Sequence, residues 1–218
     1  MMKELKFYSQ YGQDKWLYEN YFKGTKGGTF LEIGADDGID KSNTMFFEET
    51  MGWSGICIEP SPERFKLLKR NRECICERVA ISDRVGETQF LDIRGWGKGL
   101  SGIVENYPKE HLHRIDMEMK HPKNNGSEML MVQADLLNNV LSRNDVSEID
   151  FCTIDTEGSE FEILDSLDFE KYKIRIILVE NNYDENKVRY LLTDRGYSFV
   201  GQVGPIDDAF VLNEGTDI

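Results

Sequence analysis

A short acidic and glycine-rich stretch, FLEIGADDGID at residues 30–40, holds the first groups that could do chemistry. Its E-x-G-x-x-x-G spacing sets Gly34 and Gly38 among carboxylates. Gly34 lets the backbone turn and approach a ligand closely, because glycine has no Cβ atom. The dinucleotide fingerprint G-x-G-x-x-G is absent, since Asp36 stands in place of its second glycine. Acidic side chains disfavour an anionic pyrophosphate and suit a ligand with a positive centre, such as a sulfonium carrying an amino acid.

Two further polar positions follow apolar runs that we predict to be strands. Glu59 ends the run CIEPS, 25 residues after Gly34, where nucleoside-binding α/β folds place the acid that accepts hydrogen bonds from ribose hydroxyls. Ser82 and Asp83 end the run VAISD and could meet an adenine. A glycine-rich turn alone is commonly loop chemistry. Because the signals occur in order, each at a predicted strand end, together they predict a nucleoside site.

A second group of oxygen-bearing side chains follows two later runs. Asp155 ends IDFCTID, and Glu180 and Asn181 end IRIILVENN. If these strands are neighbours, three oxygen ligands converge, and carboxylate and amide oxygens suit Mg²⁺ or Mn²⁺. Such an ion would help, because a hydroxyl is a poor nucleophile until its pKa is lowered. The alternative is that Asp155 caps the next helix and the other two are loop residues.

A proton acceptor is also needed, and three side chains are candidates. His111 and His113 titrate near neutral pH, and Glu157 lies two residues after Asp155. Each has a structural alternative, because loop histidines are commonly only solvated and Glu157 could cap its helix. Gln13, in the segment SQYGQD, could close over the site from the N-terminal side.

Strands that alternate with helices must position these groups. We predict strands at TFLEIGA, SGICIEPS, ERVAISD, GETQFLDI, EMLMVQAD, IDFCTID and IRIILVENN, and helices over residues 9–23 and at SNTMFFEETMG, SPERFKLLKRN, GSEFEILDSL and ENKVRYLLTDRG. This alternation predicts a parallel α/β sheet, and YSFVGQVG with DAFVLN predicts an antiparallel hairpin at its end. Ligands of such sheets bind at the carboxyl ends of the strands, which is where the candidate residues stand.

Residues 94–127 differ in character from the rest. The segment is rich in Gly, Lys and His and shows little periodicity, so we predict an irregular insertion near the acceptor site. Trp96, Tyr107 and His121 within it could shape a pocket, because aromatic faces stack on sugar rings.

Composition limits the function classes. The formal charge of −14 and the pI near 4.7 argue against a nucleic-acid partner, which needs a basic face. The four cysteines lack the spacing of a disulfide framework or a zinc site, and we see no signal peptide or membrane-spanning run. We therefore expect a cytoplasmic protein with a single domain over residues 1–218, in which residues 1–27 form a helical cap.

Several of these stretches resemble one known family. FLEIGADDGIDKSNT, CIEPSPERF, VAISDRVGE and IDFCTIDTEGSEFEIL, preceded by SQYGQD, are similar to the FkbM-type methyltransferases, which are class I enzymes that use S-adenosylmethionine. The resemblance covers roughly residues 8–212, and its most specific part is DTEGSE at residues 155–160. It implies a Rossmann-like, seven-stranded, mostly parallel sheet with helices on both faces and an antiparallel last strand.

The resemblance also implies how a methyl donor would be held. S-adenosylmethionine would be held by the first turn, its ribose by Glu59 and its adenine near Ser82. The residues assigned to the donor are Gln13, Glu32, Gly34, Asp36, Gly38, Asn43, Glu59, Pro60 and Ser82. The arrangement of Asp155, Glu180 and Asn181 resembles the metal site of catechol-type O-methyltransferases, although Glu180 is longer than the usual aspartate.

These features predict an O-methyltransferase that acts on a hydroxyl of a sugar in a glycan or glycosylated metabolite, helped by a divalent ion. A homodimer or an association with glycosyltransferases is a further expectation. Two alternatives remain open. One is an NAD-dependent oxidoreductase on a related sheet, and the other is a non-catalytic nucleoside- or glycan-binding module.

Overall fold

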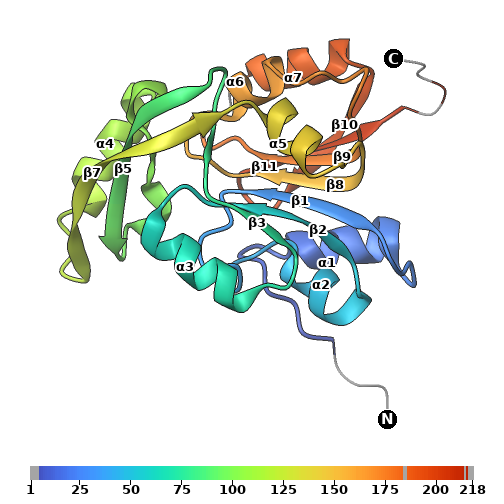
Figure 1. Ribbon diagram of the computed structural model, residues 1–218, viewed down its shortest axis with the longest axis horizontal. Helices are drawn as coiled ribbons and strands as arrows, with labels where there is room; N and C mark the ends of the chain where they lie inside the picture. The colour runs from blue at the N-terminus through green and yellow to red at the C-terminus, as the bar shows by residue number, and fades with distance from the viewer. Residues whose placement is uncertain (1–4, 184–185, 214, 216–218) are drawn as a thin grey trace.

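The central sheet confirms the predicted α/β fold. Figure 1 shows the computed structural model, which describes residues 5–183, 186–213 and 215. Seven strands lie in the order β10-β11-β9-β8-β1-β2-β3. They are β1 (Thr29–Ile33), β2 (Ser54–Ile58), β3 (Ile75–Glu77), β8 (Glu148–Ile154), β9 (Lys173–Glu180), β10 (Tyr197–Val203) and β11 (Asp207–Leu212). Strand β11 runs antiparallel to both of its neighbours, β10 and β9, and the other pairs are parallel, so the predicted terminal hairpin is present.

Helices cover both faces of this sheet, as Figure 1 shows. One face carries α5 (Leu137–Arg143), α6 (Glu160–Asp165) and α7 (Asn186–Asp194), and the other carries α1 (Gln13–Leu17), the π-helical turn Tyr18–Phe22, α2 (Met45–Met51) and α3 (Pro62–Asn71). The central strands are apolar on both sides because each face is buried, which explains their continuous hydrophobic runs. The helix-forming part of the predicted N-terminal cap therefore packs on the sheet.

A second, four-stranded sheet lies beside the first, in the green and yellow-green part of Figure 1. Its order is β4-β7-β5-β6, with β4 (Ala80–Ile81), β5 (Gly86–Gly95), β6 (Gly102–Ile103) and β7 (Asn124–Asp135), and helix α4 (Lys109–Glu118) joins its last two strands in sequence. Ala80 of β4 pairs in parallel with Ala134 of β7. The chain therefore enters and leaves this sheet through adjacent strands.

Two sequence predictions are corrected here. The strand predicted at ERVAISD is divided, because β3 pairs with β2 in the central sheet whereas β4 pairs with β7 in the second. Segment 94–127 is not irregular: it holds β6, α4, the start of β7 and the 3₁₀ turns Lys98–Leu100 and Val104–Asn106. Its periodicity was hidden because α4 buries only one side chain, His111, and the first half of β7 is largely exposed.

Two further findings concern the cysteines and the helices. Cys57, Cys74, Cys76 and Cys152 are free. In the part of the chain that the structure describes, no helix combines the length and the apolar character that crossing a membrane requires.

Candidate active site

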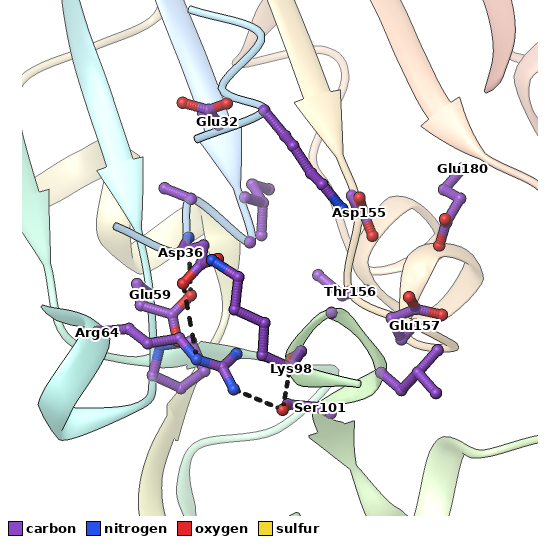
Figure 2. Close-up of a pocket in the computed structure, with 18 of the residues that line it drawn as sticks. Glu32, Asp36, Glu59, Arg64, Lys98, Ser101, Asp155, Thr156, Glu157 and Glu180 are labelled. Atoms are coloured by element: carbon purple, nitrogen blue, oxygen red, sulfur yellow. Dashed lines mark hydrogen bonds and ion pairs between the residues drawn. The ribbon is translucent and has the colours of Figure 1, made fainter. Parts of the chain in front are cut away.

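A pocket of about 550 Å³ opens at the carboxyl ends of β1, β2, β8 and β9. Its size falls in the range of small-molecule sites. The turn after β1 forms one side, the residues after β8 form another, and residues 95–103 of the second sheet face them. Figure 2 shows acidic side chains that enter this space from both ends. The sheet thus brings the two predicted groups of residues into one hollow.

Gly34 is required by the packing of the protein itself. Its φ is +90°, and a Cβ atom there would overlap the main-chain carbonyl oxygen of Asp155. Asp155 in turn donates its backbone N–H to Ile33, which ties the ends of β1 and β8 together. We expected Gly34 to admit a ligand, whereas the atom that it admits belongs to the neighbouring strand. Gly38 is similar, because a Cβ atom there would lie 2.6 Å from Leu68.

Glu32 lines the pocket, but its carboxylate is occupied by the protein. It accepts hydrogen bonds from the hydroxyls of Ser42 at 2.9 Å and Thr44 at 2.6 Å and from the backbone N–H of Asn43 at 2.7 Å. The guanidinium of Arg72 lies 3.3 Å away. Glu32 therefore holds the segment that carries Asn43 rather than presenting a free carboxylate.

Asn43 offers an unused acceptor. Its side chain lines the pocket, and its Oδ1 atom is buried with no hydrogen-bond partner among the described residues. A buried carbonyl oxygen without a partner costs free energy, which a ligand N–H or O–H group would recover. The residue was assigned to the donor from sequence, and this geometry fits that role.

Glu59 ends β2 and remains directed at the pocket. It accepts backbone hydrogen bonds from Asp36 at 3.0 Å and from Ser61 at 2.8 Å, and it is only 3% exposed. Burial raises the pKa of its carboxyl group to about 7, against the opposing charge of Arg64. Pro60 lines the same wall. Hydroxyl donors from a ribose would suit the lone pairs that remain on Glu59.

The carboxylate of Asp36 is bound by two cations. Lys98 Nζ lies 2.6 Å from Asp36 Oδ2, and Arg64 Nε lies 3.6 Å from Oδ1. Figure 2 shows Lys98 reaching across the pocket to this residue. The sequence predicted Asp36 as a free ligand for the donor, but its charge is already neutralised within the protein.

The structure places Gln13 in the pocket lining but not Ser82. Gln13 lines the pocket, where its amide nitrogen donates to Asp207 at 2.8 Å. Ser82 is not among the residues that line the pocket: its hydroxyl donates to Asp83, and its backbone N–H donates to Asp135. The cause is the departure of β4 into the second sheet. The apolar side chains of Val79, Ala80, Ile81 and Phe90 form this wall instead.

Three carboxylates gather at the other end of the pocket. Asp155, Glu157 and Glu180 each offer an oxygen, and these atoms lie within 4.8 Å of one another. Partial loss of water around the carboxylate inside the pocket and the charge of Asp207 raise the pKa of Asp155 to about 7, although its side chain keeps accessible surface. Burial and mutual repulsion also raise the pKa values of Glu157 and Glu180 well above the ordinary value. This acidic cluster, as we call the three, would be relieved by a cation or by protons.

Asn181 is not part of that cluster. Its amide nitrogen donates to Asp208 Oδ2 at 2.8 Å, and it is not among the residues that line the main pocket. In the structure, the third oxygen-bearing side chain beside Asp155 and Glu180 is therefore Glu157 and not Asn181. The reason is that the backbone after β9 is held by Ile206, whose carbonyl accepts from the N–H of Asn181.

The histidines are not placed to take a proton in the pocket. His113 is exposed on α4, and His111 is fully buried outside the pocket lining. Because the carbonyl of Leu100 can only accept, Nε2 of His111 donates to it at 3.2 Å. Burial lowers the pKa of His111, so the neutral ring accepts at Nδ1 from the hydroxyl of Tyr183, 2.9 Å away. His111 therefore lies outside the pocket itself, but its Nδ1 atom is also 3.3 Å from Oε2 of Glu157, a member of the acidic cluster.

Four basic residues of the pocket, Lys41 among them, were missed by the sequence analysis. Arg64, Lys98 and Arg114 all line it, and Arg114 lies 3.7 Å from Glu157. Only Lys98 carried a signal, because it stands in the unusual sequence GWGKG. Trp96 also lines the pocket, as predicted, and His121 stacks on it, whereas Tyr107 is buried with its hydroxyl bonded to Leu100.

Comparisons with known proteins agree with this geometry. Residues 32–199 match the family described as "Methyltransferase FkbM domain". No curated protein matches the sequence. Among solved structures, the FkbM methyltransferase of Methylobacillus flagellatus aligns with a TM-score of 0.50 at 10% identity, and the alignment covers 91% of this chain. This chain spans half the length of that protein, at 50%.

Two other solved structures align less closely. The precorrin-6y C5,15-methyltransferase of Geobacter metallireducens has a TM-score of 0.48 at 13% identity, with 98% of this chain and 93% of that chain covered. The N-terminal domain of human METTL16, solved with SAH, has a TM-score of 0.42 at 14% identity, with 91% and 65% covered. The family match spans most of the chain, including the glycine turn, Glu59 and the acidic cluster. The chain therefore belongs to the FkbM methyltransferase family.

Proposed function

We propose that this protein transfers the methyl group of S-adenosylmethionine to a hydroxyl of a sugar, in a glycan or a glycosylated metabolite, with a divalent cation at the acidic cluster. The observation that carries the proposal is that one pocket joins Glu59 and the unpartnered Asn43 oxygen to Asp155, Glu157 and Glu180. A donor site and an acceptor-activating site thus share one space. The NAD-dependent alternative loses support, because the chain lacks G-x-G-x-x-G and belongs to a methyltransferase family.

The donor fits the residues at one end of the pocket. Glu59 would accept from ribose hydroxyls, Asn43 from an N–H or O–H group, and the apolar wall with Ile81 and Phe90 would contact the base. The donor supplies an electrophilic methyl group: the new C–O bond forms as the C–S bond breaks, and the sulfonium becomes a neutral thioether. Alignment of the three atoms supplies much of the acceleration in such displacements.

The acidic cluster would bind the cation and move the proton. Three carboxylate oxygens suit a hard cation such as Mg²⁺ or Mn²⁺, whose charge lowers the pKa of a bound hydroxyl. Asp155 is the member of the cluster with accessible surface, and it lines the pocket, so it is placed to accept the hydroxyl proton. Glu157 is buried beside Arg114 and 3.3 Å from the amide of Asn182, which fixes its orientation. Trp96 offers a half-exposed ring against which a sugar could stack.

Calorimetry tests the donor site. S-adenosylhomocysteine should bind the wild-type protein, and Glu59→Gln should weaken binding at least tenfold, because the neutral amide loses the charge that strengthens its bonds to ribose. Glu63→Gln is the matched control, since Glu63 is an exposed glutamate at the start of α3. No measurable binding by the wild-type protein at millimolar ligand would reject the donor site.

Cation binding and transfer need separate tests. Mn²⁺ should raise the melting temperature of the wild-type protein but not that of Asp155→Asn, whereas the exposed Asp116→Asn should respond like the wild type. Mass spectrometry of deoxysugar glycans after incubation with S-adenosylmethionine should show the gain of one methyl group, and EDTA should abolish it. Turnover unchanged by EDTA would remove the cation from the proposal, and binding without any transfer would favour a non-catalytic module.

A further inference from the structure

The sequence GWGKGLSGI, residues 95–103, forms a distinct part of the pocket wall. Every residue of this pocket segment, as we call it, lines the pocket. It belongs to the second sheet, where it connects β5 to β6, whereas the turn after β1 belongs to the central sheet. The pocket is therefore built by two sheets, and their relative placement determines its shape.

The C-terminal half of the pocket segment is fixed by buried contacts. Leu100 is 4% exposed, and its carbonyl accepts hydrogen bonds from the hydroxyl of Tyr107 at 2.9 Å and from His111 at 3.2 Å. The hydroxyl of Ser101 donates to the carbonyl of Lys98 and accepts from Ile93 and from Arg64. These contacts attach the segment mainly to its own sheet.

The N-terminal half is attached to the central sheet by one side chain. Lys98 Nζ lies 2.6 Å from Asp36 Oδ2 and 3.4 Å from Asp40 Oδ2, both in the turn after β1. The Lys98 side chain is 33% exposed, so water reaches the ion pair only in part. Figure 2 shows the extended Lys98 chain spanning the space between the two walls. Arg64 of α3 adds a second connection, because it contacts both Asp36 and Ser101.

The two glycines beside Lys98 make the conformation of this short stretch depend on the Lys98 ion pair. Gly97 and Gly99 flank it. The backbone N–H groups of Trp96 and Gly97 donate to Lys123 and Asn124 of the second sheet, whereas a Cβ atom at Gly99 would meet nothing within 4 Å. A chain of this kind has wide backbone freedom, which a side-chain anchor removes. Partly exposed ion pairs add little to global stability, so the effect of this pair is expected in the order of the segment rather than in the folding of the whole protein.

We propose that Lys98 is a positioning residue that locks the acceptor side of the pocket onto the turn that holds the methyl donor. The inference rests on the proposed function and extends it to the coupling of the two substrates. With Lys98 engaged, the pocket segment closes over the donor and presents Trp96 to the acceptor. Without it, the donor leaves faster and the acceptor meets a disordered wall.

The test compares Lys98→Met with Lys98→Arg and with Lys66→Met. Lys66 is an exposed lysine on α3 paired with Glu63, so it controls for the loss of one surface charge. In the ligand-free proteins, Lys98→Met should speed amide hydrogen exchange in residues 98 and 99 at least tenfold, with the melting temperature nearly unchanged. Lys98→Arg should restore most of the protection, and Lys66→Met should match the wild type.

Kinetics supply the second measurement. S-adenosylhomocysteine should dissociate at least tenfold faster from Lys98→Met, and KM for the acceptor should rise more than kcat falls. In an Asp36→Asn background, the Lys98 substitution should have a much smaller effect, because one of its two partners is already neutral. Wild-type exchange rates in residues 98 and 99 of Lys98→Met, or an equal change in Lys66→Met, would overturn the inference.

The two proposals fail in different ways. A wild-type protein that does not bind S-adenosylhomocysteine rejects the proposed function, and the anchor is then judged by ligand-free exchange alone. Normal binding by the wild type, with the same dissociation rate in Lys98→Met, rejects the role of Lys98 and leaves the proposed function standing.

Discussion

At the scale of single residues, Gly34 shows how closely the two halves of the active site are packed. Its left-handed backbone and the missing Cβ atom let the end of β1 touch the backbone of Asp155. The turn after β1 and the acidic cluster therefore meet through main-chain atoms, which cannot move aside as a side chain could. A methyl group added at Gly34 would therefore disturb both the turn after β1 and the end of β8.

Gly34→Ala should lower the free energy of unfolding by at least about 3 kcal/mol, since it adds a left-handed alanine and a steric overlap with backbone. Gly126→Ala is the matched control, because Gly126 also has a positive φ, of +80°, but a Cβ atom there would meet nothing within 4 Å. It should cost only about 1 kcal/mol. Urea denaturation measures both, and equal losses would show that the contact with Asp155 does not matter.

At the scale of elements, the end of α3 holds the loop that carries Asn43. Arg72 is buried, and its guanidinium donates to Glu32, Glu48 and the hydroxyls of Ser42 and Thr44. A helix that packs on one face of the sheet thus fixes the conformation of the donor loop. The stability of the fold and the shape of the site depend on the same side chain.

Arg72→Met should therefore destabilise the protein by about 3–5 kcal/mol, because it leaves two buried carboxylates without their cation. Arg70→Met, an exposed change two residues earlier on α3, should change stability by less than about 0.5 kcal/mol. The double variant Arg72→Met with Glu32→Gln should lose less than the sum of the single variants. Additive losses would contradict the ion pair.

The elements also show where prediction from sequence succeeds. Strands β1, β2, β8 and β9 were predicted because burial on both faces demands continuous apolar runs, and the ends of those strands gave Glu59, Asp155 and Glu180. The second sheet was only partly predicted, because β4 has two residues and the pattern of β7 is largely exposed. Pairing between strands far apart in sequence leaves no local signal.

The same limit applies to the acids of the site. Glu32, Asp36 and Glu59 look alike in the sequence, but Glu32 faces Arg72 and Asp36 faces Lys98, partners that lie far along the chain. Only the fold reveals that two of the three are neutralised by the protein. Glu157 was considered from sequence as a base or a helix cap, whereas the structure places its carboxylate beside those of Asp155 and Glu180.

At the scale of the whole molecule, buried acids oppose the folding of the ligand-free protein at neutral pH. Burial raises the pKa of Glu59 from 4.5 to about 7, so the folded state holds a proton that the unfolded state has already lost. The stability from this group is fully present below pH 4.5 and is lost as the pH rises through 7. Asp155, with a pKa of about 7, likewise makes the folded state less stable as the pH rises. The lowered pKa of His111 has the opposite effect: it adds stability as the pH rises toward the ordinary pKa of histidine.

Glu59→Gln isolates the contribution of one acid. Relative to this variant, the wild-type protein should lose stability between pH 5.5 and pH 8, by about 2 kcal/mol at most. Guanidinium denaturation at the two pH values measures the difference. A difference that does not change with pH would mean that Glu59 titrates at its ordinary value.

The adjacent entry and exit of the second sheet have a consequence for how such a protein can change. Because Ala80 and Ala134 are paired, the chain between them begins and ends at the same place. The central sheet contains none of its strands, so the strand order of that sheet does not depend on this segment. Insertions, deletions or replacements within this segment therefore leave Glu59 and the ends of the central strands in place. Changes in this segment would alter the pocket wall that includes Phe90 and Lys98, while the acids at the ends of the central strands keep their positions.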